Sequence, residues 1–150
     1  MTTDEGIVYD RSLLGVETQI GTFELTREMI LGFAKSTGET NPRYLGDDNG
    51  AGDIVAPPTI CNVFVSGVSR PDINLEFGEI GFFAGQSIEC KVEIRPGDVL
   101  SASTKLDNVY VKTGRSGKMV FAVWETQFRN QDDVTVALVT ESFVRRNKNR

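Results

Sequence analysis

The second half of the chain consists of alternating and continuously apolar segments, and these restrict the fold more than any other feature. From Ile88 to Ile94, apolar residues alternate strictly with charged ones, which is the period of a strand with one solvated face. A second alternation follows, in which Leu100, Ala102, Thr104 and Leu106 are separated by serine or lysine. Residues 119–124 are apolar at every position, and 134–139 nearly so. Because both faces of such strands must be covered, the pattern predicts a sheet with a layer on each side.

Short polar segments separate these strands and have the composition of turns. Pro96-Gly97-Asp98 stands between the first two strands, and Gly114–Gly117 precedes the segment that is apolar throughout. Proline presets the φ that a turn needs, and glycine supplies positive φ at little cost. The segment Gly114–Lys118 lacks the spacing and the hydroxyl of a phosphate-binding loop. We therefore interpret it as a hairpin turn.

The first half of the chain predicts one strand followed by one amphipathic helix. Residues 16–24 alternate imperfectly and are interpreted as the strand. Thr26 is a favourable N-cap residue and Gly38 a favourable stop, so a helix is expected over 27–37. The apolar face of this helix consists of Met29, Ile30, Phe33 and Ala34.

A second and more apolar helix is expected over Thr59–Ser69, after the rigid entry Pro57-Pro58. Because the segment is rich in β-branched residues, its periodicity alone does not decide between a helix and a strand. Gly67 would cost roughly 1 kcal/mol inside a helix, which indicates close backbone packing. A helix that is apolar on all sides must be buried. We therefore expect it to cover one face of the sheet, and a second subunit or a ligand to cover the other.

The length of 150 residues predicts a single domain, 1–150. The net charge of -5 argues against nucleic acid as a partner. No apolar run approaches the roughly 20 residues that span a bilayer, and residues 1–6 contain no apolar stretch typical of a secretory signal. These features predict a cytoplasmic protein with no membrane partner. A basic run near the end of the chain is interpreted as a solvated tail, with contact to a phosphate-bearing ligand or partner as the alternative. It consists of Arg145, Arg146, Lys148 and Arg150.

The two cysteines, Cys61 and Cys90, are too few for a disulfide framework or a structural zinc site. Both lie in apolar patterns and are interpreted as small buried hydrophobes. A nucleophilic Cys61 is the minor alternative, because the chain has no histidine to activate it. The acidic segment 47–53 is expected to be a solvated loop, and we predict neither a metal site nor a cofactor. Trp124 is expected in the core or in a dimer interface.

The segment Glu39-Thr40-Asn41-Pro42-Arg43-Tyr44 follows the first helix. It resembles the Asp-x-Asn-Pro-x-His loop of MaoC-like, (R)-specific enoyl-thioester hydratases and dehydratases. Four blocks resemble the N-terminal branch of this family, the fatty-acid-synthase type: Ala34–Pro42, Ile54–Thr59, Arg95–Leu100 and Tyr110–Lys118. The resemblance extends over nearly all of the chain from about Gly15. It implies the α+β hot-dog fold, in which a curved antiparallel sheet is wrapped around a long central helix.

The resemblance also implies a chemistry and the positions that would perform it. In active members the Asp and His act as general acid and base when water adds across an enoyl thioester, and backbone amides near the central helix polarise the thioester carbonyl. Glu39 and Tyr44 stand at the Asp and His positions and are the candidate catalytic residues. A phenol with a pKa of about 10 is a poor proton acceptor at neutral pH. The candidate substrate-binding residues, by the same resemblance, are Asn41, Pro57, Thr59 and Ile60.

These replacements predict a hydro-lyase (lyase) family subunit that needs a partner. The favoured hypothesis is the non-catalytic, acyl-chain-binding half of a heteromeric (R)-hydroxyacyl-thioester dehydratase or enoyl-CoA hydratase in fatty-acid or steroid side-chain metabolism. Its expected partners are an acyl-CoA or acyl-carrier-protein thioester and, in a homodimer or heterodimer, a catalytic MaoC-like subunit with the Asp–His dyad. One alternative is a self-sufficient hot-dog thioesterase or hydratase that uses a carboxylate such as Glu39 or Asp53. The other is an acyl-thioester-binding protein without catalysis.

Overall fold

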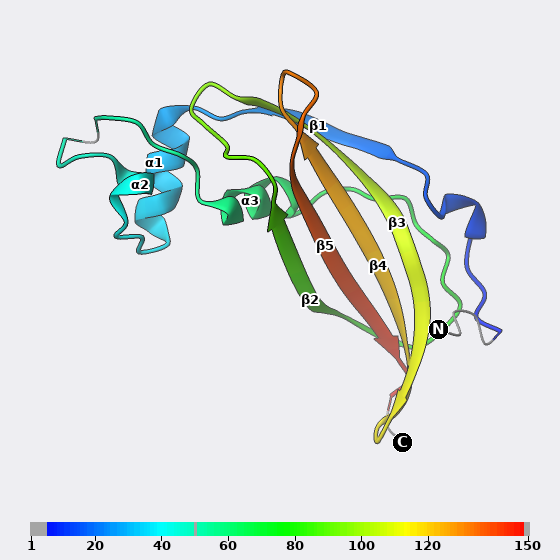
Figure 1. Ribbon diagram of the computed structural model, residues 1–150. Helices are drawn as coiled ribbons and strands as arrows, with labels where there is room; N and C mark the ends of the chain where they lie inside the picture. Colours follow the sequence, from blue (N-terminus) through cyan, green and yellow to red (C-terminus); the bar gives the residue numbers. More distant parts are fainter. Residues whose placement is uncertain (1–5, 50, 149–150) are drawn as a thin grey trace.

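The computed structural model describes residues 6–49 and 51–148 of the chain. One five-stranded antiparallel sheet, in the order β1-β3-β4-β5-β2, curves along its length (Figure 1). The strands are β1 (Thr18–Glu24), β2 (Ile80–Cys90), β3 (Val99–Gly114), β4 (Gly117–Arg129) and β5 (Thr135–Arg146). The helices are α1 (Arg27–Ser36), α2 (Pro42–Leu45) and α3 (Cys61–Val65), with 3-10 turns at Arg11–Leu13 and Pro58–Ile60. The predicted α+β class and curved antiparallel sheet are confirmed.

The inner face of the sheet carries the core, as the alternation predicts. On β3 the alternate residues Leu100, Ala102, Thr104 and Leu106 are fully buried, whereas Ser101 between them is exposed. β3 and β4 meet in a tight hairpin in which Gly114 pairs with Gly117, so the predicted hairpin turn is confirmed. The outer face is covered less completely than the continuous apolar pattern predicts, since Met119 and Phe121 on β4 are half-buried.

The first strand and the first helix lie where the sequence places them. Thr26 caps α1, because its Oγ1 accepts a hydrogen bond from the Met29 amide at 3.1 Å. Ile30 and Ala34 are fully buried, and Ile30 belongs to the core that includes Leu100 and Phe128 of the sheet. Met29, which the pattern places on the apolar face, is 39% exposed. This part of the prediction is wrong, because the buried stripe of α1 is narrower than the apolar one.

The central helix is much shorter than predicted. It begins with the 3-10 turn Pro58–Ile60, continues as α3 and ends at Val65. Ser66 is extended, and Gly67 has φ 71°, a conformation that glycine adopts easily and other residues rarely do. The cost of Gly67 within a helix is therefore resolved by ending the helix before it rather than by close packing. The predicted burial is confirmed for Ile60, Cys61, Phe64 and Val65. It is wrong for Val63, which is 52% exposed, so the helix has one open side.

An extended segment follows α3. We call residues 66–79 the strap. The strap crosses the inner face of the sheet and reaches the start of β2 beside the end of β5 (Figure 1). It runs beside the N-terminal segment, since the Asp10 amide donates to Ile73 at 2.7 Å and the Glu76 amide donates to Val8 at 2.9 Å. Its apolar side chains join a second core on the sheet, separate from the core around α3. This core contains Ile7, Tyr9, Leu106, Val109, Val120, Ala122 and Trp124, with Ile73, Leu75 and Phe77 packed against it.

β2 is an edge strand, and two predictions near it are wrong. It runs from Ile80 and ends at Cys90, so the alternation over 88–94 continues past the end of the strand. The predicted basic tail is also not a tail throughout, because Arg145 and Arg146 belong to β5 and pair with β2. Arg150 lies outside the described residues.

Candidate functional site

The loop after α1 uses the Glu39 carboxylate to hold its own backbone. The chain reverses at Gly38, which has φ 73°, and the Glu39 amide donates to the Ala34 carbonyl at 3.0 Å. Oε1 of Glu39 accepts hydrogen bonds from the amides of Thr40 and Asn41, each at 3.1 Å. One oxygen of the candidate catalytic carboxylate is therefore engaged within the loop.

Asn41 likewise has a structural role, as the N-cap of α2. Its Oδ1 accepts from the Arg43 amide at 3.0 Å, and Pro42 occupies the first turn. Tyr44 lies inside α2 and is half-buried. Within the described part of the chain, no hydrogen bond joins its hydroxyl to Glu39. The loop therefore brings the two candidate catalytic residues into one short segment but does not couple them as an acid–base pair.

Arg43 holds this loop against the segment that leads into α3. Its carbonyl accepts from the Val55 amide at 3.0 Å. Its guanidinium forms an ion pair with Glu93, and this contact lowers the pKa of the Glu93 carboxyl. The loop of the family motif and the entry to the central helix are thus adjacent, as the resemblance implies.

The entry to the central helix offers one free amide among the predicted substrate-binding positions. Pro57 is buried, and its carbonyl accepts from the Ile60 amide at 2.9 Å. The amide of Thr59, at an exposed position, has no backbone acceptor among the described residues. Pro58 has no amide hydrogen to donate. Of the two amides that could polarise a thioester carbonyl, that of Thr59 is available and that of Ile60 is not.

A cavity of about 430 Å³ lies beside the motif loop. Of the six predicted site residues only Glu39 lines it. The other residues around it are Lys35, Thr40, Pro42, Leu45, Gly46, Asp47 and Asp48. Because most of these side chains are polar or small, the cavity lacks the apolar wall that an acyl chain needs.

The two thiols differ, contrary to the sequence prediction. Cys61 is buried, and burial raises its pKa to about 12, so it stays protonated at neutral pH and is unsuited to act as a nucleophile. Cys90 is exposed on β2, and its Sγ donates to the Val92 carbonyl at 3.5 Å. The buried assignment is therefore confirmed for Cys61 and wrong for Cys90, because β2 lies at the edge of the sheet.

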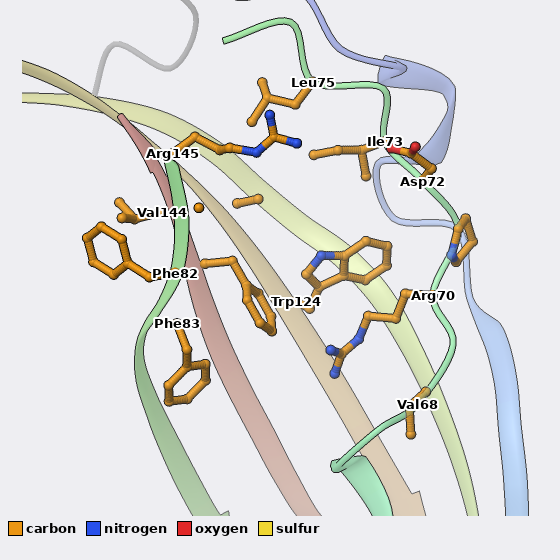
Figure 2. A pocket seen from close by; sticks show the side chains of 14 residues that line it. Val68, Arg70, Asp72, Ile73, Leu75, Phe82, Phe83, Trp124, Val144 and Arg145 are labelled. Carbon is orange, nitrogen blue, oxygen red and sulfur yellow. The ribbon is translucent and has the colours of Figure 1, made fainter. Parts of the chain in front are cut away.

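A larger, mostly apolar groove of about 440 Å³ lies between the strap and strands β2, β4 and β5 (Figure 2). None of the six predicted site residues lines it. Its walls are formed by Val68, Arg70, Pro71, Asp72, Ile73, Leu75, Gly81, Phe82, Phe83, Ala122, Trp124, Phe143, Val144 and Arg145. The sequence prediction for Trp124 is confirmed insofar as it is buried in the second core, and it also lines this groove.

Arg70 fixes the strap to the inner face of the sheet beside this groove. Its guanidinium pairs with Glu141 on β5, and the two side chains are only 13% and 9% exposed. The guanidinium also lies 5.6 Å from the ring centroids of both Trp124 and Phe143, a distance at which a cation is attracted to an aromatic face. The Nε of Arg70 is buried without a hydrogen-bond partner.

Sequence reasoning missed this groove, although one signal for it was present. Glu141, Phe143 and Arg145 alternate on β5, so all three share the inner face. Two charged residues on a face that is otherwise apolar indicate either a buried pair or a polar site. The partner of Glu141 is Arg70, which is 71 positions away in the sequence and could not be identified from it.

Comparison with known proteins identifies the family. Residues 12–139 match the family described as FAS1-like, dehydratase domain region. The chain therefore belongs to this family. No curated protein sequence matches it significantly. No helix among the described residues is long and apolar enough to cross a membrane, and those residues contain no cluster of three or more potential metal ligands.

Solved structures of MaoC-like hydratases and dehydratases share the fold. The C-terminally truncated HadBC (3R-hydroxyacyl-ACP dehydratase) complex from Mycobacterium tuberculosis is 18% identical, with a TM-score of 0.65 over 90% of this chain and 98% of that chain. The ChsH1-ChsH2 complex from the same organism is 18% identical, with a TM-score of 0.66 over 91% and 85%. The R-hydratase PhaJ1 from Pseudomonas aeruginosa is 15% identical, with a TM-score of 0.63 over 90% and 83%. These similarities confirm the hot-dog fold, here with a shortened central helix.

Proposed function

We propose that this chain is the non-catalytic, acyl-binding subunit of a heteromeric (R)-hydroxyacyl-thioester dehydratase or enoyl-thioester hydratase. One observation carries the proposal: the family's loop is retained, yet the chain contains no histidine. An imidazole titrates near neutral pH and can both accept and donate a proton there, whereas the Tyr44 phenol at the same motif position is a poor base. The missing acid–base function must then come from a partner subunit.

The local geometry of Glu39 supports this assignment. A general base needs a carboxylate oxygen directed at the proton that it removes. Oε1 of Glu39 is instead held by two loop amides. A role in shaping the loop therefore fits Glu39 better than the self-sufficient thioesterase or hydratase considered from the sequence.

The edge of the sheet supplies a surface for the partner. β2 pairs with β5 on one side, and none of the other described strands pairs with its second backbone edge. Phe82 and Phe83 on this strand are 46% and 52% exposed. Long open edges with exposed apolar residues are normally covered, because they pair readily with other strands. Two of the structural relatives are described as complexes, HadBC and ChsH1-ChsH2. We infer that β2 is the strand that meets the catalytic subunit.

The test of the function is hydration of a medium-chain trans-2-enoyl-CoA by three samples: the purified chain alone, a MaoC-like subunit that carries the Asp–His dyad, and the two co-purified. Loss of the enoyl-thioester absorbance measures the reaction. We expect turnover only in the co-purified sample, and we expect Glu39→Gln in this chain to leave it within a few fold. Full activity of the chain alone that Glu39→Gln abolishes would overturn the proposal and establish the carboxylate mechanism.

The partner surface is tested with a matched pair of variants. Phe82→Asp adds a charge to the β2 edge, and Val134→Asp adds the same charge at a similarly exposed apolar residue in the β4–β5 turn. Co-purification with the catalytic subunit should be lost with the first variant and retained with the second. Equal retention by both would place the interface elsewhere on the chain, while leaving the activity test unaffected.

A further inference from the structure

The groove beside the strap contains a cationic group, Arg145, that no acidic side chain among the described residues neutralises. Arg145 extends from β5 toward Leu75 and Ile73 at one end of the groove, with Trp124 in the middle and Arg70 beyond it (Figure 2). Arg70 is paired with Glu141. Arg145 Nη1, by contrast, makes only two long contacts, each 3.4 Å, to the carbonyl oxygens of Phe77 and Gly78. Within residues 6–49 and 51–148, no carboxylate forms an ion pair with it.

The neighbours of Arg145 hold its stem in place and leave its head accessible. Arg145 pairs with Gly81 on β2, and a Cβ built on Gly81 would lie 3.5 Å from Arg145 Cδ. The stem therefore lies over a position without a side chain. Asp72 also lines the groove, but its Oδ1 accepts from the Asn74 amide at 2.8 Å. The guanidinium thus presents free N–H donors at the mouth of an apolar groove.

The rest of the groove suits an apolar chain or ring system. Phe82, Phe83 and Phe143 line it with Trp124, and Phe83 packs edge-on to Phe143 at 5.6 Å between ring centroids. Its volume of about 440 Å³ lies in the range of small-molecule sites. At about 30 Å³ for each non-hydrogen atom, the share of one water molecule in the liquid, it holds on the order of 15 atoms.

We propose that this groove binds an amphipathic carboxylate, with an apolar body of about a dozen carbons over the aromatic floor and its carboxylate on Arg145. A guanidinium and a carboxylate form charge-assisted, bidentate hydrogen bonds. A ligand carboxylate would also supply the negative charge that Arg145 lacks among its described neighbours, in a chain whose net charge is -5. The inference goes beyond the proposed function and needs no catalytic partner, so the two can fail independently.

The test uses Trp124, the only tryptophan of the chain, as its reporter. Dodecanoate is titrated into the purified chain below its micellar concentration, and intrinsic fluorescence gives the dissociation constant. Dodecanol serves as the uncharged analogue, and dodecanoyl-CoA as an acyl ligand without a free carboxylate. We expect dodecanoate to bind about tenfold or more tightly than dodecanol, since charge-assisted hydrogen bonds are stronger than hydrogen bonds between neutral groups.

Two variants separate Arg145 from general charge effects. Arg145→Gln should abolish the preference for dodecanoate over dodecanol. Arg146→Gln, the same charge change at a neighbour that does not line the groove, should preserve it. Arg145→Lys keeps the positive charge and should retain part of the preference for dodecanoate. This variant keeps the test informative if Arg145→Gln fails to fold. Equal binding of dodecanoate and dodecanol by the wild type, or binding of dodecanoyl-CoA alone, would overturn the proposal.

Discussion

The ion pair between Arg70 and Glu141 gives the sharpest prediction about stability. Glu141→Gln removes the charge while nearly preserving the volume of the side chain. The Arg70 guanidinium then remains buried on the inner face without a counter-ion, and its Nε already lacks a hydrogen-bond partner. An unpaired buried charge is expensive because it has lost its hydration without a compensating attraction.

The magnitude follows from the burial of the pair. Removing one partner of a buried ion pair costs about 3–5 kcal/mol. The lower value applies here, because Arg70 keeps its contacts with Trp124 and Phe143 and both charged side chains retain slight exposure. We expect the free energy of unfolding to fall by about 3 kcal/mol. At about 2–4 °C per kcal/mol for a chain of this size, the Tm should fall by about 10 °C.

The assay is denaturant unfolding followed by Trp124 fluorescence, at one protein concentration so that any self-association is constant. Asp133→Asn is the control, because the Arg129–Asp133 pair is well exposed and such pairs contribute about 0–1 kcal/mol. Replacing both partners, with Arg70→Met and Glu141→Gln, should recover much of the loss, since no charge is then left unpaired. If Glu141→Gln costs no more than Asp133→Asn, or if the double variant is additive, the pair does not hold the strap and the reasoning is wrong.

Four further outcomes are expected. Gly78→Ala should destabilise the chain by well over 1 kcal/mol, because φ at this position is 74° and a Cβ would lie 2.8 Å from a backbone oxygen of β5. Gly114→Ala is the control and should cost less, because a Cβ there meets no such clash. The midpoints of denaturant unfolding compare the two variants. Thr26→Ala should cost about 1 kcal/mol through loss of the α1 cap, again by unfolding. Iodoacetamide should label Cys90 but not Cys61 in the native chain, as mass spectrometry would show. Burial raises the pKa of Cys61 from its ordinary value of 9.0 to about 12. The contribution of this thiol to stability is therefore full below about pH 9 and is lost as the pH rises toward 12, so Cys61→Ala should flatten the alkaline loss of stability.

The sequence correctly predicted those elements whose conformation depends on residues close together in the chain. The Thr26 cap, the buried alternation from Leu100 to Leu106 and the hairpin at Gly114–Gly117 each depend on residues only a few positions apart. β2 was recognised only near Ile88, because the run Phe82-Phe83-Ala84-Gly85 does not alternate and includes a register shift between Phe83 and Gly85. An edge strand buries less of its surface than a central strand, so its apolar and polar residues alternate less regularly.

Of the two candidate sites, the motif loop could be predicted from the sequence and the groove beside the strap could not. The motif loop is contiguous, so its residues were found together. Their hydrogen bonds, however, are internal to the loop, and a motif does not distinguish a catalytic carboxylate from one that holds a turn. The groove combines the strap with β2, β4 and β5, and these segments meet only after the sheet has formed. No local pattern contains that information.

The shortened central helix and the groove have a common cause. A helix rises about 1.5 Å per residue and forms a layer roughly 10 Å thick, whereas an extended chain rises about 3.3 Å per residue and is much thinner. By ending α3 at Val65 and continuing as the strap, the chain reaches across the sheet to β2 but covers less of the inner face on the way. The surface left open beside the strap is lined by Phe83, Trp124 and Arg145. In this chain the feature that departs most from the predicted fold, the early end of α3, is therefore also the one that leaves this apolar groove open.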